Sequence, residues 1–135
     1  MPASLKWLAG LFAASVVAAI VAGGAMFAQS RTRTRIMAEQ VSGGSSAAGR
    51  VAIAAYGCGS CHVIPGIAGA NGQVGPPLTK IAVRASIAGK LPNDPAAMTR
   101  WLEHPQAVVP GNDMPEQGVT RRDARDMTAY LYTLK

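Results

Sequence analysis

A long uncharged segment near the N-terminus most constrains what this chain of 135 residues can fold into. From Trp7 to Ala28 the sequence reads WLAGLFAASVVAAIVAGGAMFA, which is 22 residues without a charge. About 20 apolar residues in a helix cross the hydrocarbon core of a bilayer, and a helix satisfies its own backbone hydrogen bonds there. The sequence therefore predicts an N-terminal transmembrane anchor over residues 1–30, in contact with membrane lipid.

Two features leave the processing and the direction of this segment open. Gly23-Gly24-Ala25 offers a small-residue cleavage site, although the apolar run is longer than the roughly 7–15 residues of a signal-peptide core. Arg31, Arg33 and Arg35 follow the segment, and the positive-inside rule would leave the C-terminal part in the cytoplasm. The chemistry of the motif described below requires the other side. We give that chemistry more weight because the charge rule is statistical.

The remaining chain divides by composition into a linker and a domain. Residues 31–46 begin with the basic run RTRTR and end in a segment rich in glycine and serine. This composition predicts a flexible linker. Residues 47–135 form the predicted domain, which has nine basic and six acidic residues and thus a net charge of 9 − 6 = +3. A domain this small has a thin core and often needs a cofactor or a cross-link to fold stably.

The motif Cys58-Gly59-Ser60-Cys61-His62 carries the chemistry of this domain. The spacing C-x-x-C-H is the attachment signature of c-type haem. The two thiols can add to the two vinyl groups of one porphyrin, and the adjacent imidazole can bind the iron. A thioredoxin-like dithiol would need a βαβ context that the sequence lacks, and a zinc site would lack its other ligands. We therefore predict one covalently bound haem c, held by Cys58 and Cys61, with His62 as an iron ligand.

With this motif, the chain resembles the class I cytochrome c family over most of residues 47–135. The resemblance also includes Gly75-Pro76-Pro77-Leu78, the segment Pro110-Gly111-Asn112-Asp113-Met114 and a C-terminal helix. It implies an all-α domain around one haem, in which a C-terminal helix crosses an N-terminal one. The stretches YGCGSCHVIPG, WLEHPQAVVPGNDMP and RDMTAYLYTL are similar to a bacterial subgroup that accompanies haem-copper terminal oxidases.

The resemblance makes Met114 the second axial ligand of the iron. A thioether paired with histidine raises the reduction potential, and the flanking Pro110 and Pro115 favour a stiff loop over a helix. The other methionines are poorer candidates, because Met98 and Met127 fall on predicted helices. His104 could give bis-histidine ligation, but its place at a helix end before Pro105 suits a cap or a surface residue.

The resemblance also assigns residues around the haem. The carbonyl of Pro76 would accept the ring N–H of His62, Leu78 would pack on the same face, and Arg84 would lie near a propionate. The indole N–H of Trp101 could also reach a propionate. Alternatively, Arg84 is an ordinary solvated arginine and Trp101 is an ordinary core tryptophan.

Helical periodicity predicts three helices in the domain. The first covers Ala48 to Tyr56, the second starts at Pro95 with Asn93 or Asp94 as its cap, and the third covers Thr120 to Leu134 with a capping-box-like start. Apolar positions spaced three and four residues apart define their inner faces. The glycine-rich segment from Val63 to Val74 is expected to be a loop.

These features predict an electron carrier rather than an enzyme, because six-coordinate iron leaves no position for a substrate. We expect a single-pass protein of a bacterial cytoplasmic membrane with its haem domain on the periplasmic side. Its expected partners are redox proteins, namely a membrane-bound terminal oxidase, a quinol-oxidising complex, or both. Alternatives are a partner dehydrogenase, a haem enzyme or gas-binding protein with an open axial site, and a fixed structural subunit. The basic charge is not taken as a sign of nucleic-acid binding, because export and haem argue against it.

Overall fold

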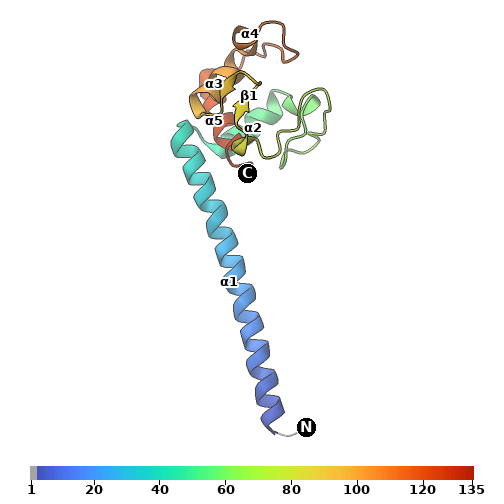
Figure 1. Ribbon diagram of the computed structural model, residues 1–135, viewed down its shortest axis with the longest axis vertical. Coiled ribbons are helices and arrows are strands. Elements are labelled where there is room, and N and C mark those ends of the chain that lie inside the picture. The colour runs from blue at the N-terminus through green and yellow to red at the C-terminus, as the bar shows by residue number, and fades with distance from the viewer. Residues whose placement is uncertain (1–2) are drawn as a thin grey trace. The chain divides into compact units, whose positions relative to one another are not determined.

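A long N-terminal helix opens the chain. The computed structural model describes residues 3–135, so residues 1–2 of the predicted anchor lie outside the described part. Helix α1 covers Ala3–Ser42 (Figure 1). Large apolar side chains such as those of Leu8, Phe12 and Ile20 are exposed along it. By length and composition this helix can cross a membrane, which agrees with the predicted anchor.

The predicted flexible linker over residues 31–46 is wrong for most of its length, because α1 continues through Ser42. The arginines and the IMAEQ segment are good helix formers that the sequence analysis grouped with the Gly/Ser run. Ala38 and Ser42 are buried, and Glu39 Oε1 accepts hydrogen bonds from the N–H and hydroxyl of Ser46 at 3.0 and 2.7 Å. Gly43, at φ +65°, ends the helix.

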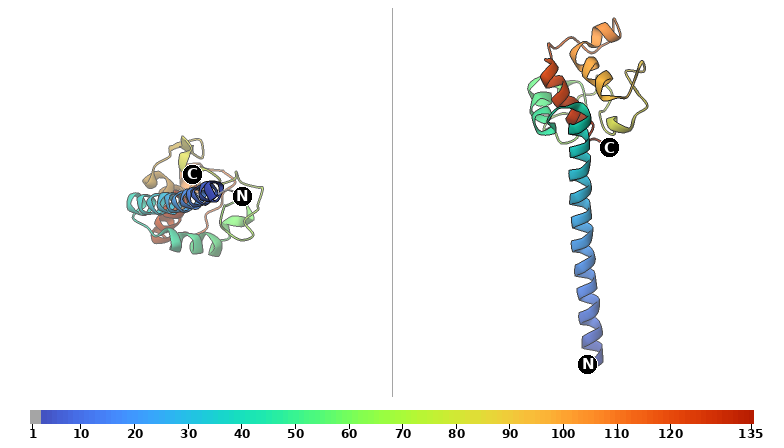
Figure 2. Two further views of the ribbon diagram at one scale, coloured as in Figure 1. Left: turned by 90° about the horizontal axis from the view of Figure 1, so that it is seen from below. Right: turned by 90° about the vertical axis from the view of Figure 1, so that its left-hand side faces the viewer.

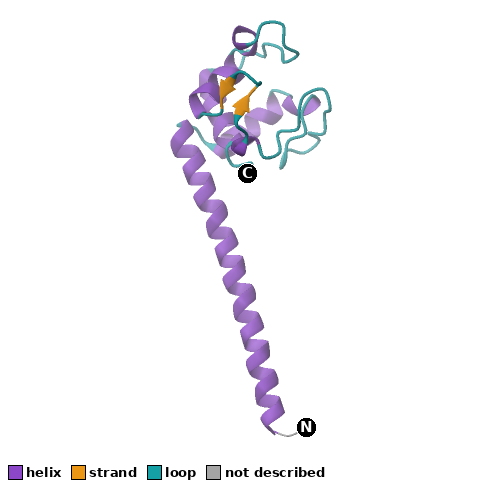
Figure 3. Ribbon diagram, viewed as in Figure 1, coloured by secondary structure: helices purple, strands orange, loops and turns teal. Residues whose placement is uncertain are grey.

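The chain divides between Thr34 and Arg35 into two compact units. The second unit contains the end of α1 and a small helical domain. Its helices are α2 (Ser46–Ala55), α3 (Pro95–Glu103), α4 (Pro105–Val108) and α5 (Arg121–Leu131), with single 3₁₀ turns η1 (Cys58–Ser60) and η2 (Ile81–Val83). Strands β1 (Ser86–Ile87) and β2 (Leu91–Pro92) form one antiparallel hairpin in which Ile87 pairs with Leu91 (Figure 3). The predicted all-α class is confirmed, and this hairpin is its only sheet among residues 3–135.

The helix caps explain where the domain helices begin. Asp94 Oδ1 accepts the N–H of Ala97 at 2.8 Å, as predicted for the start of α3. Thr120 Oγ1 accepts the N–H of Asp123 at 3.2 Å at the start of α5. The side chain of Ser45 caps α2, which therefore begins two residues before its predicted start at Ala48. Helix α5 ends at Leu131, three residues before its predicted end at Leu134.

Helices α2 and α5 cross at backbone contact. A Cβ on Gly49 of α2 would lie only 2.8 Å from the backbone N of Met127 in α5, so the absence of a side chain allows this approach. Beside the crossing, the N–H of Ser45 donates to Asp126 Oδ1 at 2.7 Å. The views in Figure 2 show α2 and α5 side by side in the domain.

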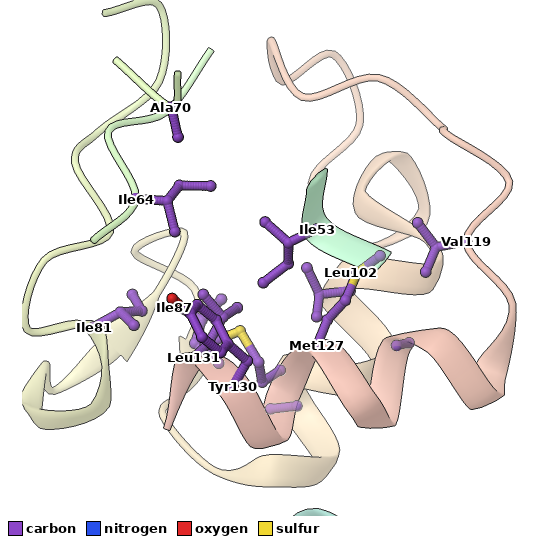
Figure 4. Packing of buried hydrophobic residues seen from close by; sticks show 13 residues of the cluster. Ile53, Ile64, Ala70, Ile81, Ile87, Leu102, Val119, Met127, Tyr130 and Leu131 are labelled. Atoms are coloured by element: carbon purple, nitrogen blue, oxygen red, sulfur yellow. The ribbon is translucent and has the colours of Figure 1, made fainter. Parts of the chain in front are cut away.

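Apolar side chains from all parts of the domain meet around this crossing (Figure 4). Ile53 of α2 and Met127 of α5 are almost fully buried. Ile64 and Ile81 enter the cluster from the loops between α2 and β1. The core is thin and contains the cavity described next. This agrees with the expectation that a domain of this size holds a cofactor at its centre.

Candidate functional site

A single apolar cavity brings the predicted site residues together. It encloses about 310 Å³, and Cys58, Cys61, His62 and Met114 all line it. The rest of its lining is mainly apolar and comes from α2, η2, β1, α3, α5 and the loops between them. Its aliphatic residues include Ile53, Ile81, Ile87, Leu102, Val119 and Leu131. The cavity therefore joins residues that lie up to about 80 positions apart in the sequence.

The C-x-x-C-H motif forms a tight turn after α2. Gly57 starts the turn in the left-handed conformation, at φ +70°, which favours glycine. The carbonyl of Cys58 then accepts the N–H groups of Cys61 and His62 at 3.3 and 3.1 Å. These bonds hold the two thiols and the imidazole at one end of the cavity.

The following loop fixes the histidine. His62 Nδ1 lies 2.8 Å from the carbonyl oxygen of Pro76, the contact that the sequence analysis expected. When Nδ1 carries the proton it donates to this carbonyl, which leaves Nε2 free as a ligand atom. The N–H of Gly75 donates to the carbonyl of Cys61 at 2.8 Å. A Cβ on Gly75 would lie 2.6 Å from His62 Nδ1, so only glycine fits beside this ring.

Met114 lies in the irregular loop that joins α4 to α5. Its side chain is half-buried and packs against the core. Met98 and Met127 also line the cavity, but they lie on α3 and α5 and are 2% and 0% exposed. Three methionines therefore contact the same space, and only Met114 belongs to a loop.

Three further predicted residues, Leu78, Arg84 and Trp101, line the cavity. The guanidinium of Arg84 donates to the carbonyls of Pro77 and Thr79, which places it on the loop that holds His62. Trp101 is half-buried and packs against the core. Their predicted contacts with propionates stay predictions.

His104 is not among the residues that line the cavity. Its side chain is 66% exposed, and its Nδ1 lies 3.7 Å from Glu116 Oε2. It is also the C-terminal cap residue of α3. Among the described residues, the structure therefore favours the predicted role as a cap or surface residue over bis-histidine ligation.

The cavity fits a covalently bound haem. Both cysteines are free thiols, so both are available to form thioethers. Burial raises the pKa of the Cys58 thiol, because the thiolate would lose its hydration. The lining is mainly apolar, and it offers one imidazole and a loop thioether to a metal. No cluster of three or more His, Cys, Asp or Glu side chains suitable for a bare metal ion occurs among residues 3–135.

Two site residues were missed by the sequence analysis. Gln106 and Asn112 surround the Met114 loop with side-chain hydrogen bonds. Their role depends on the loop backbone, so no pattern of hydrophobic spacing could reveal it. The one available signal is the position of Asn112 two residues before Met114, where Asn often bonds to the backbone.

Comparisons with known proteins identify the domain. A sequence model of the family described as Cytochrome c matches residues 46–135, which is two thirds of the chain. A search of curated proteins and a search of solved structures each found no match.

Proposed function

This chain belongs to the cytochrome c family, and from that membership we propose that it is a membrane-anchored carrier of single electrons to a haem-copper terminal oxidase. Cytochrome c domains bind haem c covalently and transfer electrons. The observation that carries the proposal is the apolar cavity lined jointly by the two cysteines, His62 and Met114.

In this proposal, Cys58 and Cys61 would form thioether bonds to the haem, and His62 and Met114 would be the ligands that hold its iron. When bound, the haem supplies an iron that is oxidised and reduced by one electron. The carbonyl of Pro76 keeps the His62 ring in one orientation. The aliphatic lining excludes water from the site, which favours the less charged state of the metal and supports a high potential. Arg84 and Trp101, which line the cavity, would lie near the acid groups of the porphyrin.

The anchor and the charge of the domain suggest where electrons are exchanged. Helix α1 is long and apolar enough to hold the chain in a membrane. We place the haem domain on the periplasmic side of a bacterial inner membrane, because covalent haem attachment accompanies export. The domain charge of 9 − 6 = +3 suits an acidic partner surface. A terminal oxidase as acceptor and a quinol-oxidising complex as donor complete the proposed path.

Substitution of the three cavity methionines tests the ligand assignment. Ligation by methionine gives the ferric protein a weak long-wavelength absorption band. We expect Met114→Ala to abolish this band, and Met98→Leu and Met127→Leu to retain it. A parent protein that lacks the band and binds carbon monoxide at neutral pH would instead be a haem enzyme or a gas-binding protein.

Purification from membranes in mild detergent tests the partner. We expect haem-copper oxidase subunits to co-purify with the chain, or its reduced form to be oxidised by membranes in a cyanide-sensitive reaction. Oxidation that is unaffected by cyanide would exclude a haem-copper oxidase as the acceptor, and reduction by a substrate dehydrogenase in the same preparation would identify that dehydrogenase as a redox partner.

A further inference from the structure

The segment around Met114 has almost no backbone support of its own. Residues 109–120 belong to no helix or strand. In the part of the chain that the structure describes, the backbone N–H groups of residues 113–120 donate to no other backbone carbonyl. A loop without such bonds samples many conformations unless side chains hold it. The position of the Met114 thioether must therefore be set by other contacts.

Gln106 supplies the first set of these contacts. Its side-chain Nε2 donates to the carbonyl oxygens of Met114 and Asn112 at 2.7 and 2.8 Å. Its Oε1 accepts the N–H of Gly111 at 3.1 Å. One amide thus joins three points of the loop, and both of its N–H groups and its oxygen are used.

Asn112 supplies the second set. Its Oδ1 accepts the N–H of Met114 at 2.7 Å. Its Nδ2 donates to the carbonyl oxygens of Pro105 and Val109 at 2.9 and 2.6 Å. The two donors face carbonyls and the acceptor faces an N–H, so these partners fix the orientation of the amide.

Both amides connect the loop to a buried anchor. Pro105 is among the side chains with less than 2% exposure, and it begins the short helix α4 that carries Gln106. The N–H of Gln106 also donates to Glu116 Oε1 at 3.0 Å, which ties the far side of the loop to the same helix. The two side-chain amides thus make six hydrogen bonds in this segment. Two of the six reach the backbone of Met114 itself, and one reaches the buried Pro105.

We propose that Gln106 and Asn112 are positioning residues that hold the Met114 thioether in the cavity and so keep competing ligands from the iron. This inference rests on the proposed ligand role of Met114. A weak thioether ligand competes well when its loop is already ordered, because little entropy is then lost on binding. Removal of either amide leaves carbonyls or an N–H without partners and frees the loop to move away.

Competition by added imidazole measures how readily the Met114 thioether is displaced. The experiment uses the full-length haem-loaded protein in detergent, and ferric protein is titrated with imidazole while the methionine band is recorded. We expect Gln106→Ala and Asn112→Ala to lower the apparent dissociation constant for imidazole by about tenfold or more, since several hydrogen bonds are lost. Asn112→Asp keeps the acceptor for the Met114 N–H and loses the donors, so its effect is expected to be smaller than that of Asn112→Ala.

Two controls separate positioning from general destabilisation. Thr99→Ala removes a buried hydrogen bond to Thr128 that joins α3 to α5 and involves neither Gln106 nor Asn112, and is expected to lower the melting temperature without changing imidazole affinity. Gln73→Ala removes an exposed amide from another loop and should change neither quantity. Parent-like imidazole affinity in Gln106→Ala and Asn112→Ala would overturn the proposal, as would an equal gain in affinity in Thr99→Ala.

Met114→Ala separates a failure of the ligand assignment from a failure of the positioning role. If its spectrum equals that of the parent, Met114 is not the ligand and the proposed function fails at this point. If Met114→Ala loses the band while the Gln106 and Asn112 variants behave like the parent, the ligand assignment stands and the positioning role is wrong.

Discussion

At the scale of single residues, Gly75 gives the sharpest expectation. A Cβ at this position would lie 2.6 Å from His62 Nδ1 and 2.9 Å from Nε2, closer than atoms normally approach. We expect Gly75→Ala to displace the His62 ring or the Pro76 carbonyl that holds it, and to cost about 1–3 kcal/mol in the free energy of unfolding. Denaturant unfolding and the ratio of haem to polypeptide measure both effects.

A nearby residue provides the control for this substitution. Gln73 is exposed and does not line the cavity, so Gln73→Ala should unfold and bind haem like the parent. Equal stability and equal haem content in the parent and in Gly75→Ala would show that the loop can move away from the ring without cost.

A second expectation at this scale concerns pH and Asp123. Its carboxylate accepts the hydroxyl groups of Thr120 and Tyr56 at 2.8 and 2.9 Å, and these bonds, that of Thr120 first, lower the pKa of Asp123 below its ordinary value. A lowered pKa in the folded state means that the ionised form stabilises the fold. This stability is complete above the pKa of the unfolded chain and is lost as the pH falls through the pKa of the folded state.

Asp123→Asn should therefore be less stable than the parent at neutral pH, and the difference should shrink as the solution is acidified. Urea midpoints at a series of pH values measure this. Glu103→Gln provides the control, because no hydrogen bond to the Glu103 carboxylate occurs within the described chain, and its urea midpoint at neutral pH should match that of the parent. A constant difference between the parent and Asp123→Asn at every pH would contradict the assignment.

At the scale of elements, the crossing of α2 and α5 depends on Gly49. A side chain there would overlap the backbone of Asp126 and Met127. We expect Gly49→Val to force the helices apart and to lower the free energy of unfolding by about 1–3 kcal/mol. Ala54→Val adds similar bulk to an exposed position of the same helix and should cost less than about 1 kcal/mol, as helix propensity predicts. Equal thermal stability of the two variants would mean that the crossing tolerates a wider separation.

The helices and strands also show which features of the fold a sequence pattern can predict. Caps at Asp94 and Thr120 were predictable, because the bonds they make lie within three residues along the chain. The attachment motif was predictable for the same reason, since its thiols and imidazole are adjacent in sequence. The hairpin of β1 and β2 was not predicted, because two paired residues on each strand leave no measurable alternation.

The continuation of α1 beyond residue 30 was missed for a tertiary reason. The Gly/Ser run from Ser42 onward suggested flexibility over the whole connector, whereas the structure has helix up to Ser42. Contacts that hold this part of the helix, such as those between Glu39 and Ser46, form only once the chain has folded. In the site, the bonds of Gln106 and Asn112 went unseen because they join side chains to a loop backbone whose course the sequence does not specify.

At the scale of the whole molecule, the apolar part of α1 decides whether the carrier stays at a membrane. Val17 and Val21 lie in the middle of the 22-residue uncharged segment. Each arginine at the centre of a span costs about 2.5–3.5 kcal/mol on insertion. We expect replacement of both valines by arginine to move the protein out of the carbonate-washed membrane fraction, as detected by immunoblotting.

The position of an added charge along the segment, rather than its presence, should decide whether the protein stays in the membrane fraction. Trp7 lies at the end of the same segment, where a long basic side chain can reach the headgroups, so Trp7→Arg should remain in the membrane fraction. An intact mass that still includes residues 1–30 would show that the segment is kept as an anchor. If the mature parent protein begins after Gly24 and is found in the soluble fraction, the segment is a signal peptide. The carrier would then diffuse between its partners, and its docking would depend on the charge of the domain alone, with a strong dependence on salt.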